Sequence, residues 1–377
     1  MPTPDAYWLA LRRVRGVGPR TCRALLDKYP SPEIIFRLAE AEIVSTGVPR
    51  PVARRIKEFR DFDSLDKELC ELPRLGAHLL KWSDDDYPSS LREIADPPPY
   101  LFVRGPAALH EPGCLAIVGA RAASEAGLRM AHRIGMELAA KGFTVVSGLA
   151  RGVDGAAHQG ALDGGGRTVA VMGCGIDVIY PPEHRKLAEA IVEGGGAIVS
   201  ELPLGTQPMA ENFPTRNRIL SGLCLGVIIV EAAEKSGSLI TARMALEQNR
   251  QVFAVPGSPL TGKTRGSNRL LKDGAKLVEC VEDVIEELAP QMVSVGSVAK
   301  KPAKSLENLS ILERPAFQNA SDEDKLILRH LKQGEKLHVD SLIGASKLTP
   351  QAVLRLLLEL ELKGVVAQHP GKLFSLV

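Results

Sequence analysis

The chain has 377 residues, of which 45% are hydrophobic and 24% are charged, and its formal net charge is +2. This length predicts two or three domains, each able to bury a core, and the composition excludes a disordered chain. The near-neutral charge excludes a general polyanion binder, so any nucleic-acid site has to be local. With no apolar run near the roughly 20 residues of a membrane helix and no signal-peptide pattern, we expect a cytoplasmic protein without membrane contact.

Residues 1–95 are expected to form an N-terminal all-α module. Apolar helix patterns flank the hairpin Gly16-Val17-Gly18-Pro19, and a weaker copy of this hairpin begins at Gly47. This pattern is typical of a tandem helix-hairpin-helix module of the SAM-like type. Such a module either binds a phosphate group through its hairpin amides or contacts another protein. The first 100 residues contain 16 Lys/Arg and 16 Asp/Glu, and this balance favours the protein contact. We expect the first 100 residues to form short helices, which end in a stiff linker at residues 96–99 (Asp-Pro-Pro-Pro).

From Cys114 to Leu288, within a predicted domain of residues 96–288, short apolar segments alternate with amphipathic ones. Strands are expected at Leu115–Val118, Thr144–Ser147, Thr168–Met172, Ala197–Ser200, Val227–Glu231 and Val252–Val255. Helices are expected at Ala126–Lys141, Val153–Leu162, Glu183–Val192, Arg216–Leu223 and Leu239–Gln248. Apolar β-branched strands separated by helices predict an α/β fold, a doubly wound parallel sheet with helices on both faces.

Residues 289–320 lose this periodicity and gather Ser, Val, Lys, Pro and Asn, which predicts a flexible linker. Residues 321–377 predict a C-terminal winged-helix domain. Its helices are expected at Ser321–Leu331, at Asp340–Ala345 and from Thr349 onward, followed by two strands around Gly371. This range carries eight Lys/Arg against seven Asp/Glu, a balance that favours a protein contact over the reading of duplex DNA.

Ligands of an open parallel sheet bind beyond the carboxyl ends of its strands. Glycines, small hydroxyl residues and arginines gather in the loops that follow the predicted strands, at 119–121, 147–154, 173–175, 212–218, 236–238 and 256–258. Backbone amides, helix N-termini and arginines in such loops bind phosphate. Because six strand ends contribute, the expected ligand is anionic and extended.

Single residues in these loops leave alternatives open. Phe213, beside Arg216 and Arg218, either stacks on a base, as aromatic residues do in single-strand sites, or anchors its helix in the core. Asp154 and His158 form either an acid/base or metal pair, or a helix cap with a neighbouring histidine whose hydrogen bonds are satisfied. No third ligand spacing accompanies them, and the six cysteines stand singly. We therefore expect no metal, no cofactor and no catalytic residue.

Two nucleotide-binding patterns are present in incomplete form. Gly173-Cys174-Gly175 lacks the third glycine of a dinucleotide fingerprint and follows the third strand instead of the first. Residues 257–264 match the phosphate-loop pattern GxxxxGK[ST], with Glu231 in place of the usual metal-binding Asp. The helix expected after this loop, Asn268–Lys272, is stopped by Gly274. A phosphate-loop ATPase is therefore the less favoured alternative.

Several long motifs follow one another in the α/β segment. They are SGLARGVD at 147–154, YPP at 180–182, SELPLG at 200–205, FPTRNRILSGL at 213–223, EAAEKSGSLITA at 231–242, VFAVPG at 252–257 and GSNRLLKDGA at 266–275. In this order they closely resemble the DNA-processing protein A family (DprA, also called Smf), from Ala116 to about Val278. The resemblance implies an extended Rossmann domain that binds single-stranded DNA without sequence preference and lacks established catalysis. It also implies a dimer that helps to load the RecA recombinase during natural transformation.

Carried over by position, the resemblance implies a DNA site. Its residues would be Arg121, Ser147, Gly148, Arg151, Phe213, Arg216, Asn217 and Arg218, with Lys186 reaching a phosphate. The loops at the strand ends add Gly119, Gly152, Asp154, Ser236, Gly237, Ser238 and Asn268 to the expected DNA-binding set. Two positions depart from the family's pattern, because Ala120 stands where a serine is common and His184 where an asparagine is common.

We therefore expect a non-enzymatic mediator of recombination that binds and protects incoming single-stranded DNA, forms a homodimer and contacts RecA. The main alternative is a nucleotide-metabolising enzyme on a related Rossmann fold, similar to the phosphoribohydrolases. The PGGxGTxxE loop of those enzymes is absent, and SGSLITA at 236–242 stands in the comparable place.

Overall fold

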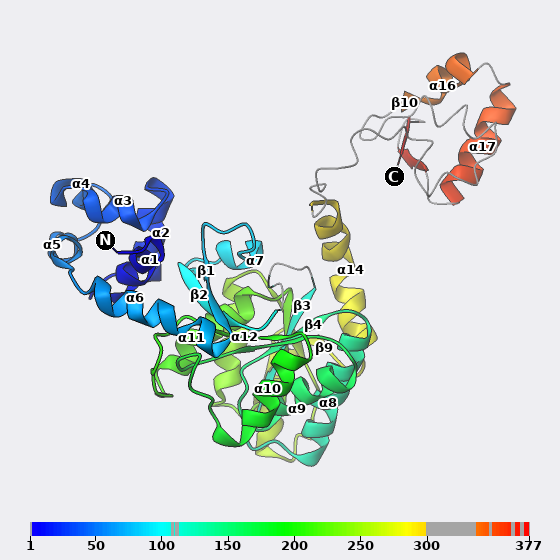
Figure 1. The fold of residues 1–377 in the computed structure, drawn as a ribbon. Coiled ribbons are helices and arrows are strands. Elements are labelled where there is room, and N and C mark those ends of the chain that lie inside the picture. The colour runs from blue at the N-terminus through cyan, green and yellow to red at the C-terminus, as the bar shows by residue number, and fades with distance from the viewer. Residues whose placement is uncertain are drawn as a thin grey trace. The chain divides into compact units, whose positions relative to one another are not determined.

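The computed structural model describes residues 2–106, 109, 113–298, 337–346, 349–362, 366–369 and 373–376. The chain divides into two compact units, Met1–Gly296 and Ser297–Val377, and each unit has a hydrophobic core of its own. The first unit combines a group of N-terminal helices with a large α/β sheet (Figure 1). Among the described residues, no helix has both the length and the apolar character that a membrane crossing requires.

Six short helices open the chain. They span Pro4–Arg13 (α1), Pro19–Lys28 (α2), Pro32–Arg37 (α3), Glu40–Val44 (α4), Arg50–Glu58 (α5) and Phe62–Glu71 (α6). Four of them begin with a proline in the first two positions, where its missing N–H costs nothing. Gly16 and Gly47 take left-handed φ angles of 95° and 88° in the two hairpins, which favours glycine there. Leu25, Ile43 and Ile56 are buried together, and the predicted helix-hairpin-helix module is confirmed.

Nine described strands form one sheet, in the order β1-β2-β6-β5-β4-β3-β7-β8-β9. They span Ala77–Lys81 (β1), Tyr100–Arg104 (β2), Cys114–Gly119 (β3), Thr144–Ser147 (β4), Thr168–Val171 (β5), Ala197–Ser200 (β6), Gly226–Val230 (β7), Gln251–Ala254 (β8) and Lys276–Leu277 (β9). In this sheet order, the seven strands from β6 through β3 to β9 pair in parallel. β1 and β2 pair antiparallel with each other, and β2 pairs antiparallel with β6, at one edge of the sheet. The direction of winding reverses between β3 and β7, which places a topological switch point there.

Helices cover both faces of this sheet. They span Ser89–Arg92 (α7), Glu125–Ala140 (α8), Val153–Asp163 (α9), Arg185–Glu193 (α10), Asn212–Gly222 (α11), Gly237–Glu247 (α12), Arg265–Lys272 (α13) and Val281–Val298 (α14), with 3₁₀ turns at Pro73–Leu75, Pro182–His184 and Gly262–Thr264. Alternate residues of β3 point to opposite faces. Ile117 is buried in one core with Ile134 of α8, and Val118 in another with Ile219 of α11. The doubly wound α/β prediction is confirmed.

The expectation that the first 100 residues are helical is wrong for β1 and for the start of β2. The stiff linker expected at 96–99 is also wrong, because Pro97, Pro98 and Pro99 are buried. The Tyr87 hydroxyl donates to the Pro98 carbonyl at 2.6 Å, and the Trp82 amide donates to the Pro99 carbonyl at 2.9 Å. These partners lie more than ten residues away in sequence, so composition alone gave no sign of them. The domain limits 1–95 and 96–288 stay predictions.

The second unit contains β10 (Leu337–His338), α16 (Val339–Ser346), α17 (Pro350–Leu362), β11 (Val366–His369) and β12 (Leu373–Leu376). Its three strands pair antiparallel in the order β10-β12-β11, and the winged-helix prediction is confirmed. The expected helix at Ser321–Leu331 and residues 299–320 of the expected linker lie outside the described residues. Residues 289–298 are helical instead of flexible, because α14 continues from its buried start at Val281 and Val284.

Candidate nucleic-acid interface

A cavity of about 540 Å³ opens at the carboxyl ends of the strands, beside the switch point between β3 and β7. We call it the switch-point cavity. It is lined by residues of 118–121, 150–154, 208–220 and 236–241, together with Tyr180. A parallel sheet brings all its strand ends to one edge, so loops that are far apart in the sequence converge on this cavity.

Arg121 and Phe213 form the rim of the cavity. Arg121 Cζ lies 5.1 Å from the centroid of the Phe213 ring, and the Tyr180 ring is 6.0 Å from Phe213 at a tilt of 49°. A Cβ on Gly173 would lie 2.9 Å from Phe213 Cδ1, so glycine leaves the room that this ring needs. Arg121 is exposed and forms no ion pair with any residue in the described part of the chain. A free cation beside aromatic rings suits the backbone and bases of a single strand.

The floor of the cavity holds a buried carboxyl group and a buried guanidinium group. Asp154 Oδ2 accepts hydrogen bonds from the amides of Gly148 at 3.1 Å and Ala150 at 3.4 Å. Arg216 Nη1 donates to the Gly148 carbonyl at 3.2 Å. Burial raises the pKa of Asp154, although the nearby Arg216 charge opposes the shift. Burial lowers the pKa of Arg216 to about 10, so this side chain keeps its charge at neutral pH.

The N-terminus of α12 forms a further wall. Ser236 is the N-cap residue, and its Oγ accepts a hydrogen bond from the Ser238 amide at 3.3 Å. Gly237 is exposed, and no atom would lie within 4 Å of a Cβ there. The positive end of the helix dipole favours an anion at this wall. The cavity thus presents positive potential at its rim and wall and a carboxyl group at its floor.

Comparison with known proteins gives the family of the chain. Residues 78–289, more than half of the sequence, match the family model of DNA recombination-mediator protein A. The chain belongs to this family, DprA/Smf. Residues 312–372 match the DprA winged helix domain, and residues 9–60 match the SAM-like helix-hairpin-helix tandem.

Relatives of this DprA/Smf chain match it over most of its length. Protein Smf of Synechocystis sp. is 33% identical over 97% of both chains, and Protein Smf of Escherichia coli is 40% identical over 86% of this chain and 84% of its own. The X-ray structure of DprA from Streptococcus pneumoniae has a TM-score of 0.67 at 36% identity, covering 76% of this chain and 99% of that one. A Helicobacter pylori DprA structure, described by its single-stranded DNA binding mode, has a TM-score of 0.52 at 30% identity, covering 57% of this chain and 96% of that one.

Many of the residues predicted for the DNA site of this DprA/Smf chain line the switch-point cavity. They are Gly119, Arg121, Asp154, Phe213, Arg216, Asn217, Ser236, Gly237 and Ser238. Their role in binding DNA stays a prediction, but the fold places them around one space. Of the two interpretations of Phe213, the structure favours stacking, because the ring lies half-buried at the rim between Arg121 and Tyr180.

Other predicted residues lie around the cavity without lining it. Ser147 is buried and donates to the Ile117 carbonyl at 2.6 Å, which ties β4 to β3. A Cβ on Gly148 would lie 2.5 Å from Arg216 Nη2, and one on Gly152 would lie 2.3 Å from the Ala120 carbonyl oxygen. Both glycines therefore let the surrounding loops approach each other closely.

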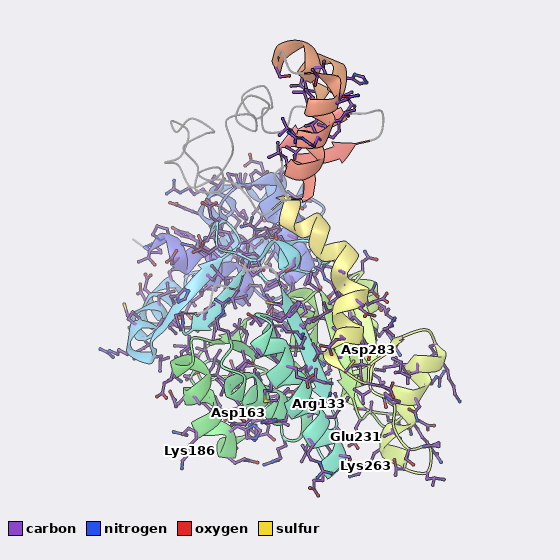
Figure 2. The ribbon with its side chains drawn as sticks, turned by 90° about the vertical axis from the view of Figure 1, so that its right-hand side faces the viewer. Arg133, Asp163, Lys186, Glu231, Lys263 and Asp283 are labelled. Atoms are coloured by element: carbon purple, nitrogen blue, oxygen red, sulfur yellow. The ribbon has the colours of Figure 1, made fainter. Side chains whose placement is uncertain are left out.

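Two predicted cations lie on the surface outside the cavity. Arg151 is hydrogen-bonded to Glu183, and this bond raises the pKa of Arg151. Lys186 is exposed on α10. Figure 2 shows it at the lower left of the view, apart from Lys263 at the lower right. Lys186 forms no ion pair with a described residue, so a phosphate contact from this side chain stays a prediction.

Arg218 does not face the cavity. It is 4% exposed, and its Nη2 lies 2.5 Å from Glu201 Oε2 while its Nε lies 3.6 Å from Asp96 Oδ2. These partners hold α11 against the end of β6 and against the segment before β2. Arg218 is thus part of the scaffold, which differs from the DNA contact that the resemblance implies.

Asp154 and His158 do not form a pair. The Thr168 hydroxyl donates its proton to the Val145 carbonyl at 2.7 Å. His158 Nδ1 lies 2.6 Å from the same hydroxyl oxygen, so Nδ1 carries a proton and donates to Thr168. Burial lowers the pKa of His158 to about 3, which keeps the ring neutral. The acid/base or metal pair is therefore wrong. The cap is wrong as well, because Asp154 accepts from amides of the loop before α9 and the N-cap residue, Gly152, has no side-chain hydrogen bond.

The phosphate-loop match at 257–264 folds differently from a nucleotide site. The Thr264 hydroxyl, which would hold the metal in such a loop, donates to the Ser258 carbonyl at 2.6 Å. Asn268 bonds both the amide and the carbonyl of Gly257, at 3.0 and 2.8 Å, so this predicted DNA residue closes the loop instead of lining the cavity. Glu231, labelled near Lys263 in Figure 2, accepts hydrogen bonds from the amide and the hydroxyl of Ser124. The Thr264 hydroxyl and the Glu231 carboxylate, which would hold the metal in such a site, are thus bonded to groups of the chain itself.

Sequence reasoning missed some of the cavity lining. Tyr180 belongs to the YPP motif, but it was not assigned to the site, although an aromatic residue in a loop at a strand end is itself a signal for base stacking. Ile240 and Thr241 of α12 and Leu220 of α11 line the cavity from within helices, where apolar residues ordinarily indicate core packing.

Proposed function

We propose that this chain binds single-stranded DNA without sequence preference, protects incoming strands, and helps to load a RecA recombinase during natural transformation. The observation that carries the proposal is the free Arg121 stacked on Phe213 at the rim of the switch-point cavity. Phosphates and base faces occur in every sequence, and these are the groups that a cation, aromatic rings and a helix N-terminus recognise. The relative from Helicobacter pylori, whose structure is described by its single-stranded DNA binding mode, supports the same ligand.

We propose binding without bond cleavage. In dinucleotide-binding folds the phosphates lie at the N-terminus of the helix that follows the first strand of the crossover. The corresponding N-terminus of α8 is taken by the chain's own carboxylate, since the Ser124 amide donates to Glu231 Oε2 at 2.7 Å. A phosphate there would meet this negative charge. The contact favours a DNA-binding protein over a nucleotide-metabolising enzyme.

We propose that the chain acts as a homodimer with RecA as a partner. Leu246 on α12 is 59% exposed and Leu277 on the edge strand β9 is 42% exposed, which supports burial of this side of the sheet against a second copy. The family description as a recombination mediator supports the RecA contact. Sedimentation of the full chain tests the dimer, and a monomer at micromolar concentration would contradict it.

The proposed ligand is tested by comparing three probes on the full chain. Fluorescence anisotropy is measured with labelled dT20, with a duplex of equal length and with a labelled ATP analogue, at about 50 and 200 mM salt. We expect dT20 to bind most tightly and to lose affinity at the higher salt, and unlabelled ATP not to displace it. Tighter binding of the ATP analogue, or release of a base from added nucleotides, would favour the enzyme alternatives.

A further inference from the structure

The loop between β4 and α9 contains a leucine in a conformation that side chains disfavour. Leu149 has a φ of 56°, in the left-handed region, and its side chain is fully buried. This conformation costs free energy in any residue other than glycine, so the surroundings have to hold it. Ala150, the next residue, lines the switch-point cavity. A group that holds Leu149 therefore also sets the shape of the proposed DNA site.

His184 is such a group. Its Nδ1 lies 2.9 Å from the Leu149 carbonyl oxygen, which can only accept, so Nδ1 carries a proton and donates it. His184 ends the 3₁₀ turn Pro182–His184 after β5, whereas Leu149 follows β4. The neighbouring Glu183 is hydrogen-bonded to Arg151 of the same loop. One short turn thus contacts the loop at two places, and His184 is the contact to its backbone.

Gly155, in the first turn of α9, leaves the room that the histidine ring needs. A Cβ on Gly155 would lie 2.8 Å from His184 Cε1 and 3.2 Å from Nε2, and the Ala150 carbonyl oxygen would be 3.5 Å away. An asparagine in place of His184 would donate from Nδ2, at the position of Nδ1, but it has no atoms where Cε1 and Nε2 lie. The need for glycine at this position therefore comes from the ring.

The same loop supports the backbone around Arg121. The Val153 amide donates to the Ala120 carbonyl at 3.2 Å. A Cβ on Gly152 would lie 2.3 Å from the Ala120 carbonyl oxygen and 2.6 Å from that of Arg121, so the two loops are in close contact. A change in the shape of the loop after β4 would therefore displace the free cation at the rim of the cavity.

We propose that His184 is a positioning residue of the single-strand site, whose hydrogen bond to the Leu149 carbonyl fixes the loop that supports Arg121. His184 acts through the backbone of residues 147–153 and is not itself a contact to DNA. Loss of His184 should therefore weaken binding without changing its dependence on salt, because no phosphate contact is removed. The proposal rests on the proposed single-strand function and adds to it a residue that acts through others.

Two substitutions of His184 test this role by anisotropy with labelled dT20 on the full chain, across a salt series. His184→Leu removes the donor, and we expect an affinity about fivefold lower, the effect of one ordinary hydrogen bond, with an unchanged logarithmic salt slope. His184→Asn keeps a donor and should bind within a factor of about two of the unaltered chain. An equal loss in both variants would overturn the role of the hydrogen bond. A shallower slope in His184→Leu would make His184 a direct phosphate contact and would overturn the positioning role.

Gly155→Ala tests the same contact from the side of α9. The added methyl group should displace the His184 ring and lower the affinity for dT20 about fivefold. In the double variant Gly155→Ala with His184→Asn the ring atoms are gone, so the affinity should stay close to that of His184→Asn. Alanine favours the helix, so neither variant should be impaired in folding by α9 itself. A loss of equal size in both backgrounds would contradict the fit between the ring and Gly155.

Hydrogen exchange observes the loop without DNA, so it separates this proposal from the proposed function. The amides of Gly148 and Ala150 are bonded to Asp154 in the folded chain. In His184→Leu we expect them to exchange about tenfold faster than in the unaltered chain, and in His184→Asn at the unaltered rate. Unchanged exchange in a folded His184→Leu variant would overturn the proposal even if the unaltered chain binds dT20. Faster exchange in a chain that does not bind dT20 would contradict the proposed function and leave His184 as the residue that holds the loop.

Discussion

Arg121 and Arg218 have the same charge and opposite surroundings. Arg121 is exposed and lies on the Phe213 ring without an acidic partner among the residues described. Arg218 is buried between Glu201 and Asp96. A surface cation gains from a ligand, whereas a buried cation depends on its fixed partners. Substitution of the first should change DNA affinity, and substitution of the second should change stability.

Arg218→Ala should lower the free energy of unfolding by about 3–5 kcal/mol, because Glu201 would be left as an unpaired buried charge. Urea denaturation measures this loss. The double variant Arg218→Met with Glu201→Leu removes both charges and should recover most of the stability. If Arg218→Ala is as stable as the unaltered chain but binds DNA weakly, Arg218 belongs to the DNA site after all.

His158 predicts a specific dependence of stability on pH. Burial lowers its pKa from 6.5 to about 3 in the folded chain, so the unfolded chain binds a proton first as the pH falls. The contribution of His158 to stability is therefore complete above pH 6.5 and is lost progressively as the pH falls toward 3. In His158→Gln the difference in free energy of unfolding between pH 7 and pH 4 should be smaller than in the unaltered chain. Equal differences in the two proteins would contradict this account.

At the scale of single elements, the loop between β3 and α8 is what holds Arg121 in place. Ser124 caps α8, since its Oγ accepts from the Gly127 amide at 3.1 Å, and its own amide donates to Glu231 after β7. A Cβ on Gly127 would lie 2.7 Å from Glu231 Cδ, so the carboxylate is packed closely against the first turn of the helix. The loop is thereby joined to the two strands that border the switch point.

Ser124→Ala should remove this cap and cost about 0.5–2 kcal/mol of stability. For a unit of this size we expect the melting temperature to fall by a few degrees. Affinity for dT20 should also fall, because Arg121 lies three residues before the cap. Ser124→Thr keeps the hydroxyl and is the matched control. A Ser124→Ala variant that melts and binds like Ser124→Thr would show that the cap does not hold the loop.

The sequence was most informative about elements with a strong local pattern. The strands at 144–147 and 197–200 match their predicted limits, because each is an apolar run bounded by turn residues. β1 and β2 were missed, since their antiparallel pairing with each other and with β6 depends on residues far along the chain. The same cause explains Arg218, whose acidic partners are distant in sequence, and the contact of Arg121 with Phe213, which the sequence did not predict.

At the scale of the whole molecule, the net charge of +2 hides the local charge at the site. Several exposed arginines pair with a Glu of the same helix, as Arg129 does with Glu125 on α8 and Arg54 with Glu58 on α5. Arg121 is different, because it combines exposure with an aromatic neighbour at a cavity. Overall charge therefore predicts little about nucleic-acid binding here, and the position of a few cations predicts more.

The two compact units predict that single-strand binding resides in the first. A chain that ends at Gly296 keeps the nine-stranded sheet, its cores and the whole switch-point cavity. We expect it to bind dT20 with the same salt dependence as the full chain, within a factor of about three in affinity. The comparison is made by anisotropy across a salt series. A loss of binding in a folded chain of this length would place essential contacts in the second unit.

The most direct test of the central claim is a salt titration of dT20 binding to Arg121→Ala, measured by anisotropy beside the unaltered chain. We predict an affinity about tenfold lower at 50 mM salt and a shallower dependence on salt, by about 0.7 in the logarithmic slope for one lost phosphate contact. Arg129→Ala, which removes an exposed arginine already paired with Glu125, is the control and should bind like the unaltered chain. If Arg121→Ala keeps both the affinity and the slope of the unaltered chain, the switch-point cavity is not the single-strand site.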